Sequence, residues 1–391
     1  MKIPKILVLG GGFAGVEAAI KLRQYGYDVT LVSNRDYLFI YPISIWIPVG
    51  KKRFDQVQLS LTKLQQKHGF KLIVDEVERL HPKDKQVRLK NQTINYDYLF
   101  IALGMSKVAS QGIEHVHSIC GAPQEAVTIR DLLQKIIKEG RGDIAIGFGG
   151  NPADPTATAI RGGPAFELLF NISHYIKQLG LRDAINIHFF APMEEPGKKL
   201  GDKPFTRLAD FYKRYKIQVH VGKKIQQFEE RQIVFEDGSA LLSDLTIFIS
   251  GGAGHSVFID SGLPLNNAGF IKIESSCQVV GHPDIFAIGD SAEIVGPDWA
   301  AKQGHIAEVM AEVGAYNLNN MLTGKETKKS YQDKLSIICI MDSGDGAAII
   351  SRTTKGGRIL LLPIVGHWLK KAWGAYYIHS KLKNIPRIPG M

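Results

Sequence analysis

The first residues suited to chemistry are glycines at a characteristic spacing after an apolar run. The segment Gly10-Gly11-Gly12-Phe13-Ala14-Gly15 directly follows Lys5-Ile6-Leu7-Val8-Leu9, which is typical of a buried parallel strand. Gly10 permits a tight turn, Gly12 lets the backbone approach a pyrophosphate, and Gly15 lets the following helix pack on the strand. The free N–H groups and positive dipole end of that helix would face the phosphates. The segment therefore predicts a bound dinucleotide.

A second segment, far along the chain, points to the same kind of site. The apolar run Ile285-Phe286-Ala287-Ile288 ends in Gly289 and Asp290. A carboxylate at the C-terminal end of a strand can accept hydrogen bonds from sugar-like hydroxyl groups. Together the two segments indicate FAD in particular. A helix N-cap is the alternative role for Asp290, and the two roles can coexist.

The glycine segment needs a strand–turn–helix–strand unit to position it. The sequence predicts this unit as a strand over 5–9, a helix over about 14–25 and a strand over 28–32. Ser33 and Asn34 follow the second strand, where an acid would normally bind a ribose hydroxyl. Neutral side chains can still hydrogen-bond a hydroxyl. The missing acid therefore weakens an NAD interpretation of this site more than an FAD interpretation.

The composition is that of an ordinary globular protein. The chain has 391 residues, 45% of them apolar and 22% charged, which is enough for two domains and a tail. Lys2 and Lys5 lead at once into the first predicted strand, so we expect no targeting signal and the cytoplasmic side. No apolar run is long enough to span a bilayer. The three cysteines, Cys120, Cys277 and Cys339, do not suggest a disulfide framework, and we predict no metal site.

The formal net charge of +10 suits nucleic acid or an anionic membrane surface. No basic stripe interleaved with aromatic residues lies in a nucleic-acid motif, so we expect no nucleic-acid partner. The excess instead collects at the C-terminus, where no acid follows Asp345. The basic residues beyond it are Arg352, Lys355, Arg358, Lys370, Lys371, Lys381, Lys383 and Arg387.

The order of apolar runs predicts two nested units. Further strands are expected over 96–104, 143–149, 185–190 and 245–252, and a helix over about 164–179. The expected fold class is α/β, with two nested Rossmann-like FAD/NAD(P)-type domains plus a C-terminal membrane-facing region. The predicted domains are an FAD-binding domain over 1–115, a second dinucleotide-type domain over 116–262, the return to the first domain over 263–325, and a C-terminal region over 326–391.

In this order the motifs resemble the two-dinucleotide-binding-domain flavoproteins, and most of all the sulfide:quinone oxidoreductases and flavocytochrome c sulfide dehydrogenase flavoprotein subunits. The narrower matches are Ser33-Asn34-Arg35-Asp36-Tyr37 with Pro42 and Trp46, then Gly163-Pro164-Ala165-Phe166-Glu167, Lys302-Gln303-Gly304 and His367-Trp368-Leu369. The resemblance implies FAD, with Asp290 on its ribityl chain. The cofactor-binding residues expected are Gly10, Gly12, Phe13, Ala14, Gly15, Ser33, Asn34, Pro42, Gly104, Gly289, Asp290 and Lys302.

The nearest alternative family, the type II NADH:quinone dehydrogenases, requires an intact second nucleotide turn. Here Gly147 and Gly149 lead into Gly150-Asn151-Pro152, and proline lacks the N–H that a phosphate would use. The strand over 185–190 ends in Ala191-Pro192, and Glu194 and Glu195 lie beyond that proline. Both requirements of an NAD site therefore look broken.

Sulfide oxidation in the family uses a pair of cysteines close to the flavin. Cys339 matches one of the pair, and Cys120 matches another cysteine often found in these reductases. Arg161 stands where the partner of Cys339 is expected. Two accounts remain open: Cys120 and Cys339 form the working pair, or sulfide chemistry is lost and a different donor reduces the flavin. Cys277 has no family match and is expected to be a small buried core residue.

Three further residues have expected roles around the flavin. The family places a glutamate at the position of Glu167, suited to proton transfer with a quinone, although an acid also suits the first turn of a helix. Lys302 is expected either at the pyrimidine edge of the flavin or as a solvated surface lysine. His305 is expected to be a hydrogen-bonded histidine rather than a proton relay.

The tail over 363–383 predicts a helix that lies in a membrane interface. Ile364, Trp368, Ala372 and Tyr376 recur at four-residue spacing, and lysines 370, 371 and 381 add charge. Trp and Tyr with lysines and no acids are typical of such a helix. The alternative is a helix packed on the core or on a partner in a homo-oligomer.

These observations favour an FAD-dependent oxidoreductase, similar to sulfide:quinone oxidoreductases, which passes two electrons from sulfide or a similar small donor through FAD to a membrane quinone. Its catalytic residues would be Cys339, Cys120 and Glu167. It would be peripheral, on the cytoplasmic side of the membrane. A protein similar to type II NADH:quinone dehydrogenases is the alternative, and a non-catalytic flavin-binding or assembly protein is the second.

Overall fold

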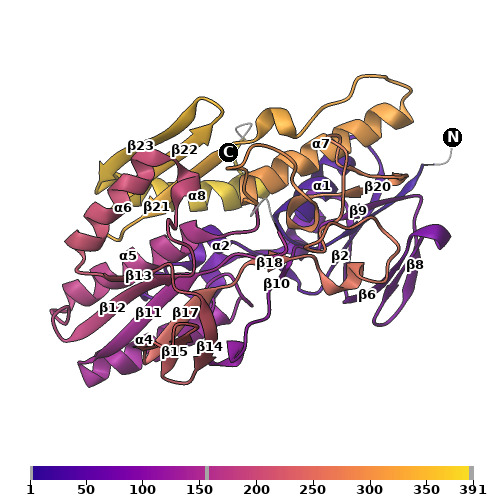
Figure 1. The fold of residues 1–391 in the computed structure, drawn as a ribbon. Coiled ribbons are helices and arrows are strands. Elements are labelled where there is room, and N and C mark those ends of the chain that lie inside the picture. Colours follow the sequence, from indigo (N-terminus) through magenta and orange to yellow (C-terminus); the bar gives the residue numbers. More distant parts are fainter. Residues whose placement is uncertain (1–2, 155–157, 387–391) are drawn as a thin grey trace.

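The computed structural model describes residues 3–154 and 158–386, which form two α/β units and a C-terminal region (Figure 1). The first unit is built on a six-stranded sheet. All neighbours in it are parallel except the first pair, and strands from the two ends of the chain lie side by side. Its order is β19 (Gln278–Val279), β20 (His282–Ala287), β9 (Tyr98–Ile101), β1 (Lys5–Leu9), β2 (Asp28–Ser33) and β5 (Lys71–Val74).

Two helices carry the predicted cofactor segments of this unit. Helix α1 (Phe13–Gln24) connects β1 to β2, as the sequence predicts, and packs against α7 (Gly304–Leu322). The late strand was expected to run to Asp290, but β20 ends at Ala287. Gly289, whose φ of +63° lies in the left-handed region, begins a 3-10 turn over Gly289–Ser291 instead.

The second unit is inserted between β9 and β20 of the first. Its sheet is entirely parallel, in the order β13 (Gln218–Val221), β12 (Ile185–Ala191), β11 (Gly142–Phe148) and β17 (Leu245–Ile249). The same unit contains three helices, which are α4 (Glu125–Glu139), α5 (Gly162–Gln178) and α6 (Asp202–Arg214). The two nested Rossmann-like units that the sequence predicts are therefore confirmed.

The remaining short helices and strands lie outside the two main sheets. They are β3 (Tyr37–Phe39), α2 (Tyr41–Ser44), β4 (Gln58–Ser60), α3 (Leu61–His68), β6 (Val77–His81), β7 (Gln86–Leu89), β8 (Thr93–Asn95), β10 (Ser106–Lys107), β14 (Ile225–Glu229), β15 (Gln232–Phe235), β16 (Ala240–Leu242) and β18 (Gly252–Ala253).

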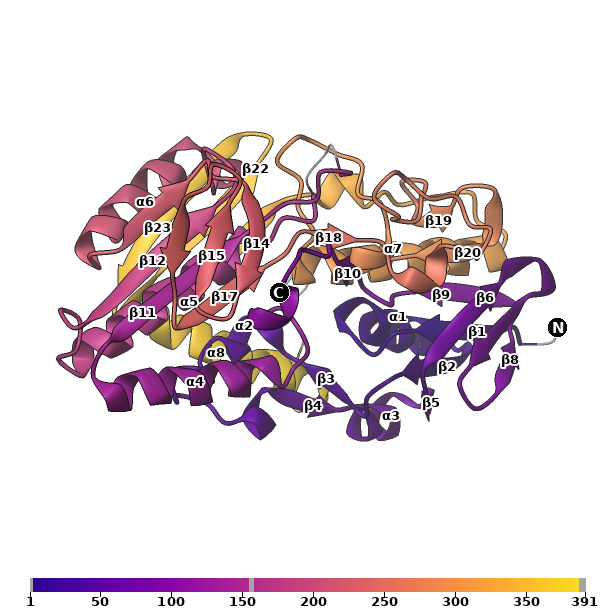
Figure 2. The same cartoon turned by 60° about the horizontal axis from the view of Figure 1, so that its bottom comes forward.

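The C-terminal region is an antiparallel sheet followed by a helix. The sheet consists of β21 (Ile337–Asp342), β22 (Gly346–Thr353) and β23 (Gly356–Pro363), and the helix is α8 (Val365–Lys381). In Figure 2, α8 extends from the second unit towards α1, and it contacts α2 on the way. This region therefore bridges the two units.

Helix α8 has its apolar stripe outside. Ile364 just before it is 69% exposed and Trp368 is 63% exposed, whereas Lys370 and Lys381 are buried. The tail lysines were expected to add surface charge, and for these two the expectation is wrong because each meets a buried carboxylate. Among the described residues, no helix is long and apolar enough to cross a membrane.

Two glycines allow this inverted packing. A Cβ atom on Gly366 would lie 2.7 Å from the backbone nitrogen of Ala347 on β22. A Cβ atom on Gly374 would lie 2.9 Å from Cγ2 of Ile43 on α2. Glycine lowers the intrinsic stability of a helix, but here both glycines permit the close approach that buries the lysines.

Candidate active site

The glycine turn after β1 leaves the N-terminus of α1 open. Gly10 has a φ of +107°, and a Cβ atom there would overlap the carbonyl oxygen of Ala102. A Cβ atom on Gly15 would overlap the carbonyl oxygen of Gly10. Gly12 is the N-cap residue of α1 and has no side chain that could cap the helix. A Cβ atom there would meet no other atom within 4 Å. The free N–H groups of this first turn can therefore donate hydrogen bonds to phosphate oxygens, which fits a dinucleotide such as FAD.

The structure brings the two predicted cofactor segments together. A Cβ atom on Gly289 would lie 2.9 Å from Cβ of Ala14. Phe13 faces the first residue of α7, since a Cβ atom on Gly304 would lie 3.5 Å from the Phe13 ring. Helix α7 also begins without a side-chain cap. Two uncapped helix N-termini therefore meet beside the turn that carries Asp290.

The end of β2 lies against the same turn. The Ser33 hydroxyl oxygen accepts a hydrogen bond from the Arg35 backbone N–H at 3.2 Å, and a Cβ atom on Gly11 would overlap this hydroxyl. Asn34 is exposed, and Pro42 lies half-buried in α2. Binding of the cofactor by these residues stays a prediction.

A hydroxyl that the sequence did not reveal ties β9 to the aspartate turn. The Gly104 N–H donates to Oγ of Ser291 at 3.0 Å, and this hydroxyl donates to the Gly104 carbonyl oxygen at 3.2 Å. Gly104 itself has a φ of +81°. Ser291 is fully buried, so its hydroxyl joins the two turns within the protein interior. The signal in the sequence for this contact with Gly104 is the serine that directly follows Gly289-Asp290.

Arg161 joins the two units at the position where a cysteine was expected. It is the N-cap residue of α5, and its guanidinium forms an ion pair with Asp290. Burial favours the neutral form, but the charges of Asp290 and Cys120, with a side-chain hydrogen bond to Cys120, outweigh it and raise the pKa of Arg161. No described helix is capped by the Asp290 side chain. Arg161 thus connects Asp290 with Cys120.

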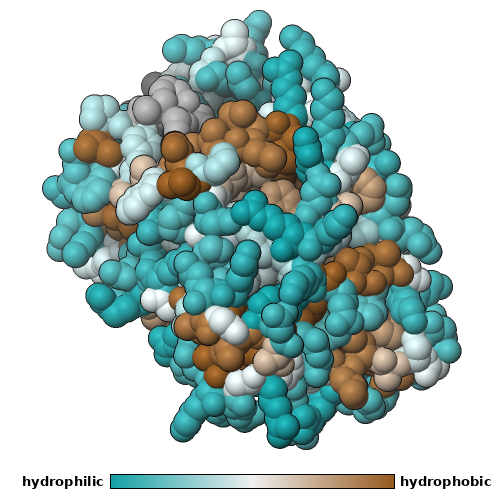
Figure 3. Space-filling view, turned by 90° about the vertical axis from the view of Figure 1, so that its left-hand side faces the viewer, coloured by the Kyte–Doolittle hydropathy of each residue, from teal (hydrophilic) through white to brown (hydrophobic). Residues whose placement is uncertain are grey.

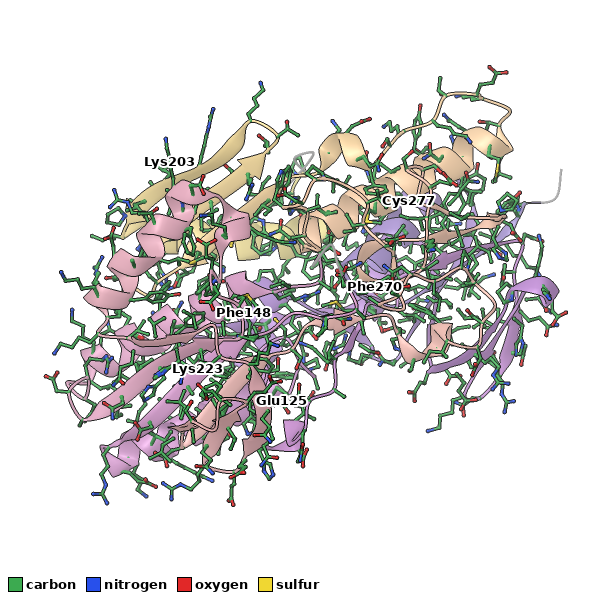
Figure 4. The ribbon with its side chains drawn as sticks, viewed as in Figure 1. Glu125, Phe148, Lys203, Lys223, Phe270 and Cys277 are labelled. Atoms are coloured by element: carbon green, nitrogen blue, oxygen red, sulfur yellow. The ribbon has the colours of Figure 1, made fainter. Side chains whose placement is uncertain are left out.

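Lys302 is a buried residue rather than a surface lysine. Its ammonium donates to the Ala292 carbonyl oxygen and lies 4.0 Å from the centre of the Phe270 ring, which is labelled in Figure 4. Burial lowers its pKa to about 8. His305 contacts Oγ of Ser336 at 3.3 Å, and burial lowers its pKa to about 4, which suits a neutral hydrogen-bonded histidine.

Glu167 lies on α5 at the junction with α8. Its carboxylate forms an ion pair with Lys370 and accepts a hydrogen bond from the Asp342 backbone N–H at 2.7 Å. Burial raises the pKa of Glu167 to about 7, against the opposing effect of the Lys370 charge. Burial and the charge of Glu167 raise the pKa of Cys339 to about 12. A Cβ atom on Gly163, one turn before Glu167 on α5, would lie 3.9 Å from the Cys339 sulfur, so Cys339 and Glu167 are neighbours.

A second carboxylate extends this cluster towards the surface. Asp342 contacts Nδ1 of His367 at 2.5 Å and accepts a hydrogen bond from the Trp46 indole at 3.4 Å. Although burial opposes ionisation, the hydrogen bond to His367 outweighs it and lowers the pKa of Asp342. His367 also packs edge-on against Trp368, which is exposed. Polar contacts thus extend from Glu167 to Asp342 and on to His367, which lies beside the exposed Trp368.

The three cysteines occupy different environments, and all are free thiols. Cys277, labelled in Figure 4, is fully buried in the first unit, and burial raises the pKa of its thiol, which confirms the expected core role. Cys120 and Cys339 both lie near the start of α5: Cys120 beside Arg161, and Cys339 with its sulfur 3.9 Å from a Cβ atom built on Gly163. Within 3–154 and 158–386, no group of three or more ligands is placed to hold a metal ion.

The second nucleotide turn differs from the first. Strand β11 ends at Phe148, but α5 begins only at Gly162, so residues 149–161 separate them. A Cβ atom on Gly162 would lie 2.8 Å from the Phe148 ring, which therefore packs on the start of the helix. Glu194 beyond β12 lies against the turn at Gly222, 2.6 Å from a Cβ atom built there. This turn lacks the direct strand-to-helix connection that a pyrophosphate site uses.

Comparisons with known proteins agree with this architecture. The family described as pyridine nucleotide-disulphide oxidoreductase matches residues 4–311. A sulfide-quinone reductase of Aquifex aeolicus is 27% identical over 362 residues, covering 88% of this chain and 82% of the relative. A type II NADH:quinone oxidoreductase of Staphylococcus epidermidis is 21% identical over 370 residues, covering 88% and 89%.

Solved structures show the same fold. The crystal structure of the sulfide:quinone oxidoreductase from Aquifex aeolicus has a TM-score of 0.87 at 22% identity, over 97% of this chain and 92% of that one. NDH2 from Plasmodium falciparum in complex with NADH has a TM-score of 0.72 at 15% identity, with 100% of both chains covered. Because the family match spans most of the chain, this protein belongs to the pyridine nucleotide-disulphide oxidoreductase family and is an FAD-dependent oxidoreductase.

Proposed function

We propose that this protein oxidises sulfide and passes the two electrons through FAD to a membrane quinone. One observation carries the proposal. Cys339 and Glu167 are neighbours beneath α8, and the outer face of that helix is apolar. A thiol, a carboxyl group whose pKa suits proton transfer and a surface suited to a lipid-soluble acceptor therefore lie within one region.

The donor is assigned to sulfide because the second unit is poorly suited to NADH. The start of α5 is occupied by Phe148 and Arg161, and the latter is already paired with Asp290. The sulfide-quinone reductase of Aquifex aeolicus supports the same choice. Cys120 and Cys339 would handle sulfur near the start of α5, and when FAD is bound it supplies the two-electron acceptor between donor and quinone.

The acceptor is assigned to a membrane quinone because of the surface around α8. Hydrophobic residues gather in patches on the face shown in Figure 3, the side that carries the C-terminal sheet and α6. The exposed apolar residues from this region are Ile338, Leu360, Leu361, Ile364, Val365, Trp368 and Leu369. Such a surface suits a peripheral membrane protein.

An anaerobic reduction experiment tests the donor. The FAD-loaded enzyme is mixed with sulfide or with NADH, and bleaching of the flavin absorption is followed. We expect rapid bleaching by sulfide and slow bleaching by NADH. Cys339→Ala should slow the sulfide reaction by at least about a hundredfold, since the thiol that would handle the sulfur is removed. Cys277→Ala, at the buried thiol of the core, is the matched control and should react normally.

Three results would contradict the proposal. Bleaching by NADH and not by sulfide would assign the protein to the NADH:quinone type. Bleaching by neither would mean another donor or a non-catalytic flavin-binding protein. Equal sulfide rates in Cys339→Ala and in Cys277→Ala would remove Cys339 from the reaction.

A further inference from the structure

Four polar side chains from both units converge at the N-terminus of α5. Arg161 forms its ion pair with Asp290 and a side-chain hydrogen bond with Cys120. Lys107, the last residue of β10, lies close enough that the charges of all three act on it. The cluster therefore brings two cations, one carboxylate and one thiol together.

This cluster has an excess of positive charge. Nζ of Lys107 and Nε of Arg161 are buried, and neither has a hydrogen-bond partner among the residues that the structure describes. A buried cation without a partner is unfavourable, and burial accordingly lowers the pKa of Lys107. A small anion held between these groups would offset the imbalance and use the unpaired N–H groups.

The thiol determines which anion would be useful here. Cys120 is half-buried and contacts the guanidinium directly, so an anion bound at Arg161 would lie beside its sulfur. Arginine stays charged at every working pH, so the attraction is permanent. An arginine cannot carry sulfur as the expected cysteine would, but it can hold a sulfur anion in place.

We propose that Arg161 and Lys107 form a binding site for a small monoanion beside Cys120, and that its occupant during turnover is hydrosulfide. The choice of hydrosulfide rests on the proposed function, whereas the anion site itself does not. Arg161 is then a positioning and specificity-determining residue, which selects the anionic donor and orients it towards the thiol.

Titration with thiocyanate, an unreactive monoanion, tests the site in the oxidised FAD-loaded enzyme. Binding is followed by perturbation of the flavin absorption spectrum. Arg161→Gln and Lys107→Gln should each raise the Kd by about tenfold or more, while Arg161→Lys should change it less. Lys203→Gln is the charge-matched control, because Lys203 is exposed on α6 and points away from the site in Figure 4. The Arg161→Gln and Lys107→Gln variants should also need about tenfold more hydrosulfide for half-maximal flavin reduction.

Alkylation of Cys120 gives a readout that does not depend on turnover. Iodoacetate is anionic and iodoacetamide is neutral, so the site should favour iodoacetate at Cys120. At Cys339, which lies beside Glu167, that preference should be absent. Arg161→Gln should abolish the preference at Cys120, measured by peptide mass spectrometry. If this variant is purified without FAD, its alkylation ratio and the Lys107→Gln titration decide the matter.

The outcomes separate this inference from the proposed function. If thiocyanate binding depends on Arg161 but sulfide leaves the flavin oxidised, the anion site stands and the sulfide assignment fails. If sulfide reduces the flavin equally well in wild type and Arg161→Gln, hydrosulfide is not the occupant of the site, and the sulfide assignment stands. Unchanged thiocyanate affinity in both Arg161→Gln and Lys107→Gln means that the two cations serve only the protein or its bound FAD, and it overturns the inference.

Discussion

Glu167 is the residue whose environment determines its chemistry most directly. Burial raises its pKa from the ordinary value of 4.5 to about 7, although the Lys370 ammonium and the Asp342 N–H favour the charged form. A carboxyl group that titrates near neutrality can deliver a proton to a reduced quinone and recover it from solvent in the same pH range.

Glu167→Gln should remove a pH-dependent step from the reoxidation of the reduced enzyme by a short-chain quinone. In the wild type the proton is present below about pH 7 and is lost above it, so the rate should fall by up to about tenfold per pH unit at higher pH. The variant should be slow and nearly independent of pH. Stopped-flow reoxidation of the flavin measures both profiles. An identical titration in wild type and variant would show that another group delivers the proton.

The pH dependence of stability provides an independent check on the same carboxyl group. Its folded pKa of about 7 lies above the ordinary value of 4.5, so the folded state binds more protons between these values. Unfolding free energy should therefore fall as the pH rises from about 4.5 to about 7, and Glu167→Gln should lack this part of the fall. Denaturant titrations at the two ends of the range measure the difference. The opposite sign would mean that Glu167 is ionised throughout this range.

The sequence indicated single residues of the site better than their partners. Cys339 and Glu167 could be proposed from motifs, and the structure places them together. Lys370 was assigned to a charged surface, because nothing local to it shows that a carboxylate on α5 lies opposite. Arg161 was noticed only as a departure from the expected cysteine. Its pairing with Asp290 depends on how the two units face each other, and one sequence does not encode that in any periodic pattern.

At the scale of elements, α8 is a helix that buries its polar face and exposes its apolar face. The four-residue spacing of apolar residues correctly predicts a helix with an apolar stripe, and that stripe is exposed. The opposite face contains lysines and glycines, which a solvated face would also contain. It is buried because Lys370 and Lys381 each meet a carboxylate and Gly374 fits against Ile43. The periodicity of a helix fixes its two faces but does not decide which one is inside.

The C-terminal end of α8 contacts the first unit through a cluster of buried charged side chains. Lys381 pairs with Glu17 of α1 and with Glu308 of α7, the latter at 2.7 Å, and the Tyr377 hydroxyl donates to the same Glu308 carboxylate at 2.8 Å. Removing one member of a buried ion cluster leaves charge without compensation. The cluster therefore links the C-terminal helix to both helices whose N-termini face the cofactor site.

Lys381→Met should destabilise the protein by about 3–5 kcal/mol, because two buried carboxylates would lose their shared ammonium. Denaturant unfolding, followed by circular dichroism, measures this change. The matched control is Lys383→Met, two residues further on, where the side chain is exposed and bonds only to the Lys67 carbonyl oxygen among the described contacts. This variant should stay within about 0.5 kcal/mol of wild type. Equal effects of the two substitutions would contradict a structural role for the cluster.

At the scale of the whole molecule, three separate parts of the chain complete one site. Asp290 comes from the first unit, Arg161 from the second and Lys370 from the C-terminal region. The nested order of the units was predictable from apolar runs and glycine turns, but the contacts among the three parts were not. Helix α8 forms ion pairs with both units. The surface that would meet a membrane therefore belongs to a helix that packs on the elements around the cofactor site.

Membrane attachment should depend on the outer face of α8 and the neighbouring strand rather than on the tail as a whole. Deleting the tail would also remove Lys370 and Lys381, so point substitutions are the cleaner test. Trp368 is 63% exposed and Leu360 is 57% exposed, and burial of such side chains in a bilayer contributes about 1.5–3 kcal/mol each. The double variant Trp368→Glu with Leu360→Glu should therefore lower partitioning onto anionic phospholipid vesicles at least about tenfold, measured by sedimentation, while sulfide still bleaches the flavin.

Leu242→Glu, at a side chain 65% exposed on β16 of the second unit, should bind vesicles like wild type. Unchanged binding of the double variant would show that this apolar face is not the membrane surface, and the quinone would then have to approach from another side.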